Sequence, residues 1–470
     1  MSELVLLGQT MSGQTTRQKA LLLAVQLPSV SDEDHAADLA ELGRLVTTLG
    51  HDVVGTISQR RASVSKGAVL GRGKLAELAK ITSGPGLSGM RYRKPGTHKR
   101  GENENDEDAP ESVEDELGEE EADEDVATSG ISKPDLIVVD HDLTPSQLRN
   151  LEKCVGVPVL DRAGVIIEIF HRHARSREAR LEVEIARLNY VAPRLRETGG
   201  SSERQHGRGS GESQLELDRR KIRDRIAELR KEIEAIVKEQ ANRRALRHDA
   251  RRVALVGYTN AGKSSLMRAL TGSEVLVEDK LFATLDTTVR AMHPEVKPRI
   301  LVSDTVGFIK KLPHDLVASF RSTLDEALEA SLLLYVADAS DPTFRSQLEV
   351  TRSTLADIGA AHVPHKLVLN KIDRVEERER LLLSREFPEA ILLSAKDQAD
   401  VVQLRQTILE IFEARMVDGE IVVPYTKQGL VSEVYENARV LSEDYDELGA
   451  HLAVRAEPAV LARLRTLIEK

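Results

Sequence analysis

The chain has 470 residues, a formal net charge of −11 at pH 7 and one cysteine, Cys154. This length predicts several domains that each bury a core, and one cysteine excludes a disulfide framework and a cysteine-rich metal cluster. The sequence has neither an apolar run of membrane-spanning length nor a signal-peptide pattern, so a cytoplasmic protein without membrane insertion is expected.

The acidic charge is concentrated in one segment. Residues 101–130 contain fifteen acidic residues and no Lys or Arg, which leaves 66 basic and 62 acidic residues elsewhere, a net charge of +4. With the Gly- and Pro-rich stretch before it, this segment has too few apolar residues to offset the entropy lost on ordering. We therefore expect residues 84–130 to be a disordered insertion, and residues 1–19 to be a flexible N-terminus.

The insertion interrupts a small domain that is expected over residues 20–165. Its apolar segments read as strands at residues 20–28, 51–59, 135–143 and 157–162. Helical segments lie between them, and the first begins after Ser31, which has the side chain of an N-cap. Strands that alternate with helices predict a parallel sheet.

Residues 166–250 have the pattern of two helices that fold back on each other. Leu181, Ile185, Leu188, Ala192 and Leu195 are spaced by four and three residues, as in a coiled-coil seam. A second series keeps a compatible register at Leu215, Ile222, Ile226, Leu229, Ile233 and Ile236. The segment between them, residues 197–212, is rich in Gly and Ser and is expected to be a flexible tip.

The predicted hairpin is also basic. Between His171 and Arg252 there are 22 Lys or Arg residues against 14 Asp or Glu residues. Such an excess allows binding along a phosphate backbone, because each neutralised phosphate releases counterions. A solvated coiled coil that packs two domains together explains the charge equally well.

The stretch RVALVGYTNAGKSS, residues 252–265, runs from an apolar strand through GxxxxGKS into a helix. Gly257 and Gly262 allow backbone N–H groups to turn toward a triphosphate, Lys263 reaches the β and γ phosphates, and the Ser264 hydroxyl can ligate Mg²⁺. The helix presents its positive end to the same anion. The other loop residues expected at the nucleotide are Tyr258, Thr259, Asn260, Ala261 and Ser265.

A second motif, RILVSDTVG, also follows an apolar strand. It places Asp304 where a carboxylate can hold Mg²⁺ through water, and Gly307 where an N–H can touch the γ phosphate. Thr305 and Val306 lie between them and are expected beside the nucleotide. The motif therefore completes the phosphate end of the predicted site.

Two further motifs predict the base that is bound. KLVLNKID supplies Asn370, Lys371 and Asp373, and the Asp373 carboxylate can accept two N–H groups that guanine has and adenine lacks. ILLSAK supplies Ser394, Ala395 and Lys396, with the Ala395 N–H directed to the guanine oxygen. Because the carboxyl ends of parallel strands meet at one edge of a sheet, the motifs predict a GTP or GDP site.

Residues 416–470 read as strand, helix, strand, strand, helix, a small α+β domain without a catalytic constellation. The predicted fold class is therefore α/β. A P-loop GTPase domain, residues 251–415, is preceded by a small parallel α/β domain and an antiparallel helical hairpin, and is followed by the α+β domain.

At this point the chain resembles the HflX family of translational GTPases. The resemblance rests on LGRGKLAEL, DRAGVIIEIFHRHARSREARLEVEIARL, GRGSGESQLELDRR and FATLD, and it covers residues 20 to about 415. It implies a monomeric GTPase that binds the large (50S) ribosomal subunit and its rRNA. The hairpin tip would lie near the peptidyl-transferase centre, and the protein would dissociate stalled 70S ribosomes, notably under heat stress.

The residues alone leave another function class open. A nucleotide-dependent regulatory switch could use the hairpin to bind a protein partner or a ribosome-assembly factor, without splitting activity. The arginine distribution and the family motifs favour the ribosome-acting enzyme.

The resemblance also aligns Thr284 of FATLD with the switch threonine, whose hydroxyl meets Mg²⁺ and whose N–H senses the γ phosphate. It places Phe282 and Ala283 beside the nucleotide. Thr287 and Thr288 are nearby alternatives, since this chain has Thr287 where the family usually has proline.

Catalysis is expected from Lys263, Thr284 and Gly307. Phe308 follows Gly307, at the position where many small GTPases have the glutamine that orients attacking water. Phenylalanine has no group that could do this, so hydrolysis should be slow alone and completed by a partner.

Overall fold

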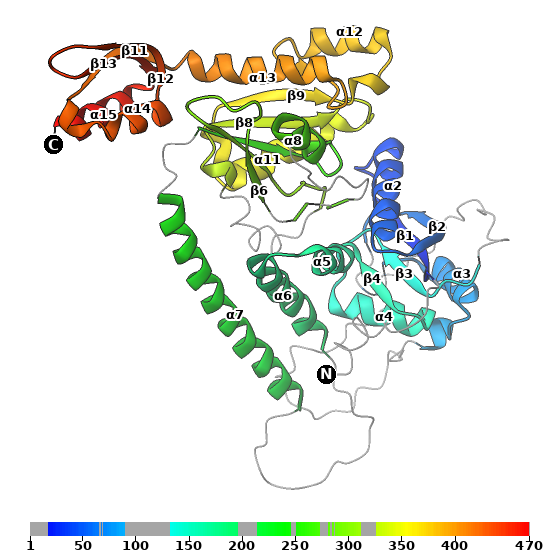
Figure 1. Ribbon diagram of the computed structural model, residues 1–470. Helices are drawn as coiled ribbons and strands as arrows, with labels where there is room; N and C mark the ends of the chain where they lie inside the picture. Colours follow the sequence, from blue (N-terminus) through cyan, green and yellow to red (C-terminus); the bar gives the residue numbers. More distant parts are fainter. Residues whose placement is uncertain are drawn as a thin grey trace. The chain divides into compact units, whose positions relative to one another are not determined.

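The computed structural model describes residues 17–64, 67, 69–89, 132–195, 214–245, 251–272, 281–282, 284–285, 287–311 and 326–469. Most of the predicted flexible N-terminus, most of the insertion, the hairpin tip and Ala283 lie outside these ranges. The predicted end of the N-terminus at residue 19 is wrong, because Lys19 is the first residue of a strand. The chain divides into two units, Met1–Arg172 with Ala186–Ile226 and His173–Ile185 with Ala227–Lys470, and each is described by itself (Figure 1).

The first unit contains a four-stranded sheet in which all strands are parallel, as predicted. Its order is β2-β1-β3-β4, formed by β1 (Lys19–Gln26), β2 (Asp52–Arg60), β3 (Leu136–Val139) and β4 (Val159–Asp161). The helices between the strands are α2 (Asp32–Thr48), α3 (Arg72–Thr82) and α4 (Pro145–Val155). The Ser31 hydroxyl accepts the Asp34 N–H at 3.1 Å, so Ser31 is the N-cap of α2 as expected.

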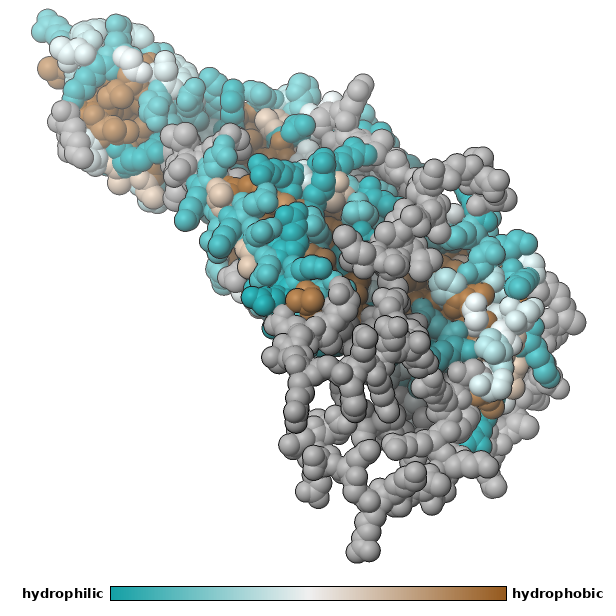
Figure 2. Space-filling model, turned by 90° about the horizontal axis from the view of Figure 1, so that it is seen from below, coloured by the Kyte–Doolittle hydropathy of each residue, from teal (hydrophilic) through white to brown (hydrophobic). Residues whose placement is uncertain are grey.

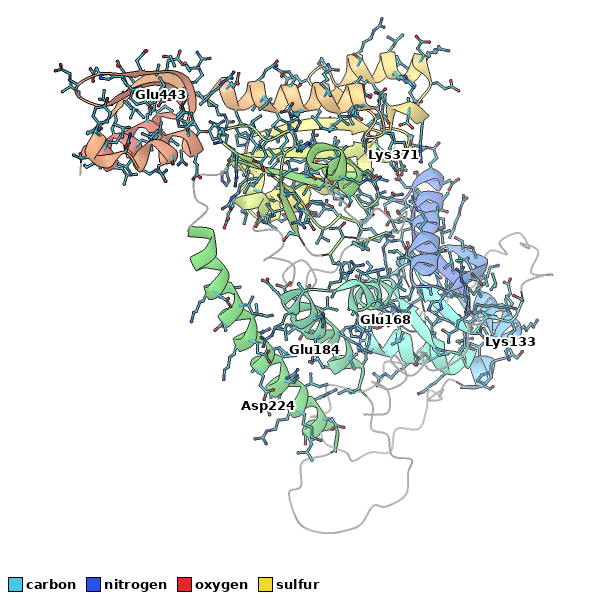
Figure 3. All side chains as sticks on the ribbon, in the orientation of Figure 1. Lys133, Glu168, Glu184, Asp224, Lys371 and Glu443 are labelled. Carbon is cyan, nitrogen blue, oxygen red and sulfur yellow. The ribbon has the colours of Figure 1, made fainter. Side chains whose placement is uncertain are left out.

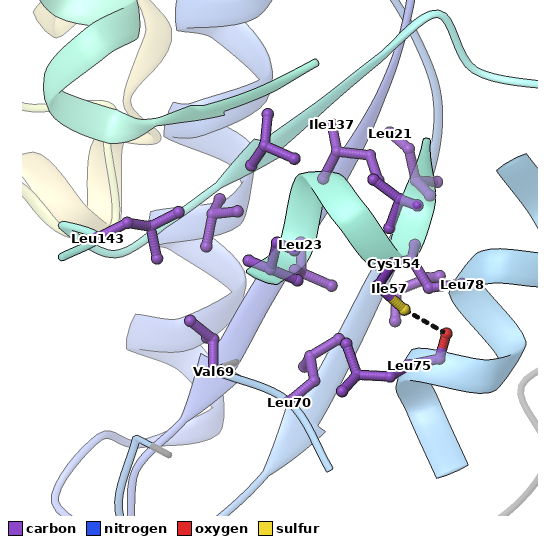
Figure 4. Close-up of a cluster of buried hydrophobic side chains, with 14 of the residues drawn as sticks. Leu21, Leu23, Ile57, Val69, Leu70, Leu75, Leu78, Ile137, Leu143 and Cys154 are labelled. Atoms are coloured by element: carbon purple, nitrogen blue, oxygen red, sulfur yellow. Dashed lines mark hydrogen bonds between the residues drawn. The ribbon is translucent and has the colours of Figure 1, made fainter. Parts of the chain in front are cut away.

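Apolar side chains of the strands pack against α3 and α4 in one core (Figure 4). Leu21, Leu23 and Ile137 from the sheet are fully buried there. Cys154 lies in the same core, where its Sγ donates to the carbonyl oxygen of Leu75 at 3.7 Å. Burial raises the pKa of this thiol, so Cys154 is a small apolar core residue.

The predicted start of the insertion at residue 84 is wrong. Residues Gly86–Gly89 form a short 3₁₀ helix, η2, and Leu87 packs against the core. The Gly84 N–H donates to the carbonyl oxygen of Ala79 at 2.9 Å, and a Cβ at Gly84 would lie 2.2 Å from the carbonyl oxygen of Val155. Residues 84–89 therefore belong to the folded domain, because Gly and Pro here make a tight turn.

This boundary leads to a prediction about two deletions. Joining residue 90 to 131 through a short Gly-Ser linker should leave the melting temperature within about 2 °C of the parent, because the deleted residues are acidic and poor in apolar side chains. Joining Ser83 to 131 also removes the buried part of Leu87, which costs about 1–2 kcal/mol. Calorimetry that finds equal melting temperatures for both variants would contradict this assignment.

The first of the two helices predicted over residues 166–250 is divided into two helices, α5 (Arg162–His173) and α6 (Arg177–Val191). The Ser176 hydroxyl accepts the Ala179 N–H at 3.1 Å and starts α6 after the break. Apolar residues of α5, including Val165, Ile169 and Phe170, are fully buried in the first unit. The predicted domain boundary at residue 165 was therefore wrong, and this domain extends through α5.

The two predicted arms of the hairpin are present as α6 and α7 (Gln214–Ala245). Leu181, Ile185 and Leu188 of the predicted seam are buried, but Ala192–Arg194 is a 3₁₀ helix that ends the regular spacing. On α7, Ile222 and Leu229 are buried. Arg177 pairs with Glu232 at 2.9 Å, which places the start of α6 beside the second half of α7, as in an antiparallel pair.

Asp161 ties the end of α6 to the sheet. This carboxylate is fully buried and accepts from the Tyr190 hydroxyl at 2.8 Å and from Arg194 at 2.9 Å. It also accepts the Gly164 N–H at 2.8 Å. These bonds fix the α6 end to β4.

The next residue, Arg162, carries a second buried charge cluster. Its side chain is fully buried and pairs with Asp140 at 2.6 Å and with Glu41. One guanidinium group is therefore shared by carboxylates from α2 and from the end of β3.

The second unit contains a six-stranded sheet with the order β10-β9-β8-β5-β7-β6. Its strands are β5 (Arg251–Gly257), β6 (Thr288–Ala291), β7 (Ile300–Asp304), β8 (Leu332–Asp338), β9 (His365–Asn370) and β10 (Ile391–Leu392). Only β6 is antiparallel among these described strands, so the predicted parallel sheet has one antiparallel edge.

Helices cover this sheet on both faces. One apolar cluster contains side chains of α8 (Lys263–Thr271) and α13 (Gln398–Glu413), and another contains side chains of α11 (Phe344–Asp357) and α12 (Glu377–Glu386). Short 3₁₀ helices, η4 (Ala360–His362) and η5 (Ile372–Arg374), lie before and after β9. This is an open α/β sheet, and its central strand β5 leads directly into the GxxxxGKS loop.

The C-terminal residues form the predicted α+β arrangement. The sheet order is β11-β13-β12, with β11 (Val417–Val423), β12 (Arg439–Tyr445) and β13 (Ala450–Ala456) all antiparallel. The helices are η6 (Tyr425–Lys427), α14 (Leu430–Asn437) and α15 (Pro458–Glu469). Apolar residues gather on this domain, at the left of Figure 2.

Among the described helices of the chain, none is long and apolar enough to cross a membrane.

Candidate nucleotide-binding site

A cavity of about 270 Å³ lies at the carboxyl edge of the six-stranded sheet. All four predicted motifs contribute to its wall. The lining residues are Thr259, Asn260, Gly262, Lys263, Ser264, Ser265, Phe282, Thr284, Thr305, Gly307, Asn370, Lys371, Asp373, Arg374, Ser394, Ala395 and Lys396. Residues from positions 259 to 396 therefore meet in one place, as the strand order requires.

Two glycines give the loop after β5 its shape. Gly257 has φ +154° and Gly262 has φ +95°, conformations that side chains disfavour. A Cβ at Gly257 would lie 2.1 Å from the Val336 carbonyl oxygen, and one at Gly262 would lie 2.2 Å from Asn370 Nδ2. The loop can therefore pack closely on β8 and β9 only with glycine at these positions, and α8 begins directly after it.

Lys263 lies at the bottom of this loop. Its side chain is 6% exposed, and Nζ donates to the carbonyl oxygens of Gly257 at 3.0 Å and of Tyr258 at 2.8 Å. Burial lowers the pKa of Lys263 to about 8, against a smaller opposite effect of the Asp304 carboxylate. Because desolvation of this ammonium group outweighs the attraction of Asp304, a bound anion would stabilise its charged form, and Lys263 is therefore a strong binding group for an anion.

Three oxygen-bearing side chains meet beside Lys263. Ser264 Oγ lies 2.6 Å from Asp304 Oδ2 and 2.8 Å from Thr284 Oγ1, which is 3.2 Å from the same carboxylate oxygen. Burial raises the pKa of Asp304. Within the described part of the chain, its other oxygen, Oδ1, is buried without a hydrogen-bond partner. Thr287 and Thr288, the alternatives to Thr284, do not line the cavity.

Gly307 packs against the same lysine. A Cβ at this position would lie 2.8 Å from Thr259 Cα and 3.0 Å from Lys263 Nζ, so the backbone approaches the loop more closely than a side chain would allow. The next residue, Phe308, is 3% exposed and does not line the cavity. Its side chain therefore presents no polar group to the site.

The other end of the cavity is formed by the residues after β9 and β10. Asn370 Nδ2 donates to the Ala261 carbonyl oxygen at 2.9 Å, and Lys371 Nζ donates to that of Asn260 at 2.8 Å (Lys371 is labelled in Figure 3). Asp373 accepts from the Ser394 hydroxyl at 2.7 Å, and this bond is the main cause that lowers its pKa. The carboxylate therefore stays ionised and keeps acceptor capacity for a ligand.

One predicted contact has a competitor within the protein. The Ala395 N–H, which is expected to point to a guanine oxygen, donates to Oδ1 of Asn370 at 3.0 Å. A ligand oxygen would have to share this N–H with Asn370. The sequence did not reveal the competition because Asn370 lies 25 residues earlier.

Several residues of the site were missed in the sequence. Asp338, at the end of β8, pairs with Lys371 at 2.7 Å and fixes its side chain. Arg374 lines the cavity, and Asp400 accepts the Ser394 N–H at 2.7 Å. Asp338 could have been predicted from the sequence. It is the last residue of an apolar strand, and the carboxyl ends of parallel strands lie at the same edge of the sheet as the other motifs.

Some predicted residues support the wall without lining it. These are Gly257, Tyr258, Ala261, Asp304 and Val306. Gly257, Tyr258 and Ala261 offer carbonyl oxygens to the lysine and asparagine side chains described above. Ala283 lies outside the described ranges.

Family models match most of the chain. The model described as 50S ribosome-binding GTPase matches residues 252–371. The model described as GTP-binding GTPase N-terminal matches residues 36–88 and 116–171. The model described as GTP-binding GTPase Middle Region matches residues 173–247. The N-terminal model leaves residues 89–115 unmatched, inside the predicted insertion.

Two relatives match two thirds of the chain or more. A protein named GTPase HflX from Gluconacetobacter diazotrophicus is 60% identical over 446 residues, which are 95% of this chain and 97% of that protein. GTPase HflX from Escherichia coli is 39% identical over 323 residues, 67% of this chain and 76% of that protein. A crystal structure of a GTP-binding protein from Sulfolobus solfataricus in complex with GDP matches at 23% identity and a TM-score of 0.41, over 84% of this chain and 98% of that chain.

Proposed function

The chain belongs to the HflX family of GTPases, and from this membership we propose that it binds the large 50S ribosomal subunit and its rRNA and dissociates 70S ribosomes. It is a GTPase, which converts GTP to GDP and phosphate. The observation that carries the ribosomal part of the proposal is the match of a 50S ribosome-binding GTPase model to residues 252–371, which contain the phosphate end of the cavity and, from its base end, Asn370 and Lys371.

We assign the phosphates to the end of the cavity beside α8. Lys263 would bind the β and γ phosphates, since its ammonium group is buried beside the loop. The N-terminus of α8 faces the same anion with free backbone N–H groups. Gly307 would donate its N–H to the γ phosphate. Lys263 and Gly307 therefore act on the negative charge that shifts during phosphoryl transfer.

The residues beside Lys263 fit a Mg²⁺ ion. Ser264 and Thr284 would ligate it, and Asp304 would hold it through water, because Mg²⁺ prefers oxygen ligands and keeps part of its water shell. The buried Oδ1 of Asp304 offers an acceptor to such a water. When bound, the ion neutralises charge on the phosphate oxygens. Among the described residues, no group of three or more His, Cys, Asp or Glu side chains could hold a metal instead.

Asp373 would select guanine, with Lys371 along the base and Asn370 bracing the loop. Phe308 has no group that could orient water, so we propose that turnover is slow until a partner completes the site. For that partner we propose the large ribosomal subunit.

The hairpin supplies a surface suited to RNA. Among the described residues of α7, the exposed basic side chains are Arg219, Arg220, Lys221, Arg223, Arg225, Arg230, Lys231 and Lys238. Such a concentration of cations can bind a phosphate backbone and release counterions. A monomer that inserts this hairpin between subunits would act as a wedge.

Replacing residues 199–211 by a short Gly-Ser turn tests this function. The shortened protein should still bind GTP and still sediment with 50S subunits, because most basic residues lie on the helices. It should not convert 70S ribosomes to subunits in a sucrose gradient, because the shortened hairpin would no longer reach far enough to separate the subunits.

The control keeps the tip length and replaces only Arg204 and Arg208 by serine, which separates loss of charge from loss of length. Splitting by the shortened protein at the parent's rate would make the tip a passive connector. Absence of any 50S association with a non-hydrolysable GTP analogue would favour the regulatory switch that binds a protein.

A further inference from the structure

The segment after β7 pairs with the phosphate-binding loop as a short parallel ladder. The Thr259 N–H donates to the Phe308 carbonyl oxygen at 2.8 Å, and the Phe308 N–H donates to that of Gly257 at 3.1 Å. These two bonds join the loop to the residues directly after Gly307. The position of Gly307 is therefore fixed through its neighbour.

A side chain extends this ladder by one residue pair. The Tyr258 hydroxyl accepts the Lys310 N–H at 2.7 Å. Tyr258 is 3% exposed and its side chain does not line the cavity. The tyrosine therefore contacts the segment after Gly307 from within the loop and leaves the ligand space free.

The ladder and the phosphate lysine use the same acceptor. The Gly257 carbonyl oxygen accepts from Lys263 Nζ at 3.0 Å and from the Phe308 N–H at 3.1 Å. Lys263 Nζ is also 3.0 Å from the position of a Cβ on Gly307. A shift of the segment would consequently move Gly307 relative to the ammonium group that faces the phosphates.

We propose that Tyr258 is a positioning residue for the γ phosphate. Its hydroxyl holds residues 307–310 on the loop and so keeps the Gly307 N–H where the third phosphate lies. This inference rests on the GTP site proposed above. Because GDP has no third phosphate, the contact stabilises bound GTP selectively. By linkage, the third phosphate must in turn stabilise the contact.

Tyr258→Phe keeps the ring and removes the hydroxyl. With fluorescent nucleotides, affinity for a non-hydrolysable GTP analogue should fall three- to tenfold, the size expected for one neutral hydrogen bond. GDP affinity should change by less than about twofold. The kcat/KM for GTP without ribosomes should fall in parallel with the affinity for the analogue.

Tyr335→Phe is the matched control. Tyr335 lies on β8 in the same domain, is 5% exposed and packs edge-on against His365 with ring centroids 4.8 Å apart. It should leave both affinities unchanged. An equal loss for GDP and the GTP analogue in Tyr258→Phe, or no loss for either, would overturn the proposal, since a purely structural tyrosine affects both nucleotides alike.

Hydrogen exchange on the unmodified protein gives an independent test that does not depend on the folding of a variant. The Lys310 amide should exchange more slowly with the GTP analogue bound than with GDP bound. Equal exchange in the two states would also overturn the proposal. Failure of the parent protein to bind GTP would instead remove the proposed function itself.

Discussion

Replacing Lys263 by alanine is expected to weaken GTP binding by about 10²-fold or more. The change removes a buried ammonium group, and the charge-assisted hydrogen bonds to two phosphates that we propose for it would contribute about 3 kcal/mol or more in total. Titration with fluorescent GTP measures the loss. Lys366→Ala, on β9 and outside the cavity, is the control and should bind GTP like the parent.

The same lysine gives GTP binding a defined pH dependence. Burial lowers its pKa from the ordinary value of 10.5 to about 8 in the empty site, so the ammonium form is disfavoured there. A bound triphosphate favours that form, so binding takes up a proton once the free protein has lost it. Affinity should therefore be constant below pH 8 and fall as the pH rises above it.

The pH profile separates Lys263 from other groups. The decline that begins near pH 8 should disappear in Lys263→Ala, because no other residue proposed at the phosphates would titrate there, and a decline that remains at higher pH would come from ionisation of the guanine N1–H. An alanine variant that keeps both the affinity and the decline above pH 8 would remove Lys263 from the phosphate site.

Asp373→Asn is expected to exchange the base that the protein prefers. Asparagine offers one acceptor and one donor group, so it cannot accept both guanine N–H groups, and GTP affinity should fall about 10²-fold or more. Xanthosine triphosphate presents an oxygen where guanine has its exocyclic amine, so its affinity should rise. Competition titrations with both nucleotides measure the exchange.

The control for this exchange is Asp357→Asn, an exposed aspartate at the end of α11 that does not line the cavity. It should keep the preference for GTP. The asparagine at position 373 can still accept from the Ser394 hydroxyl, so a change in base preference would not reflect a collapsed loop. Unchanged GTP binding by Asp373→Asn would assign the base to other residues.

The elements that could be predicted from sequence are those specified by contiguous residues. GxxxxGKS contains its own turn glycines, so Gly257 and Gly262 were sufficient to predict the loop, although the strands on which it packs, β8 and β9, could not be identified from the motif. Likewise, NKID and SAK each follow an apolar strand, and parallel strands bring their carboxyl ends together. The gathering of Asn370 and Ser394 at one cavity followed from that rule.

The misses depend on contacts between distant residues. The break between α5 and α6 interrupts a continuous basic, helical pattern, and only the burial of α5 shows which domain it joins. The bond between Tyr258 and Lys310 spans 52 residues, and that between Ala395 and Asn370 spans 25. Both hydrogen bonds depend on the side-chain conformations of Tyr258 and Asn370, which cannot be predicted from the spacing of residues in a local motif.

The buried group around Arg162 has a consequence for how this family can evolve. Arg162, Glu41 and Asp140 are each less than 5% exposed, so a neutral substitution of Arg162 removes the positive charge that both buried carboxylates share. Breaking a buried ion pair in this way costs about 3–5 kcal/mol, a large part of a typical stability of about 5–15 kcal/mol. Lineages that lose Arg162 alone are therefore at a disadvantage. The three positions should be inherited as a set, and their replacement by apolar residues requires nearly simultaneous changes in segments more than a hundred residues apart.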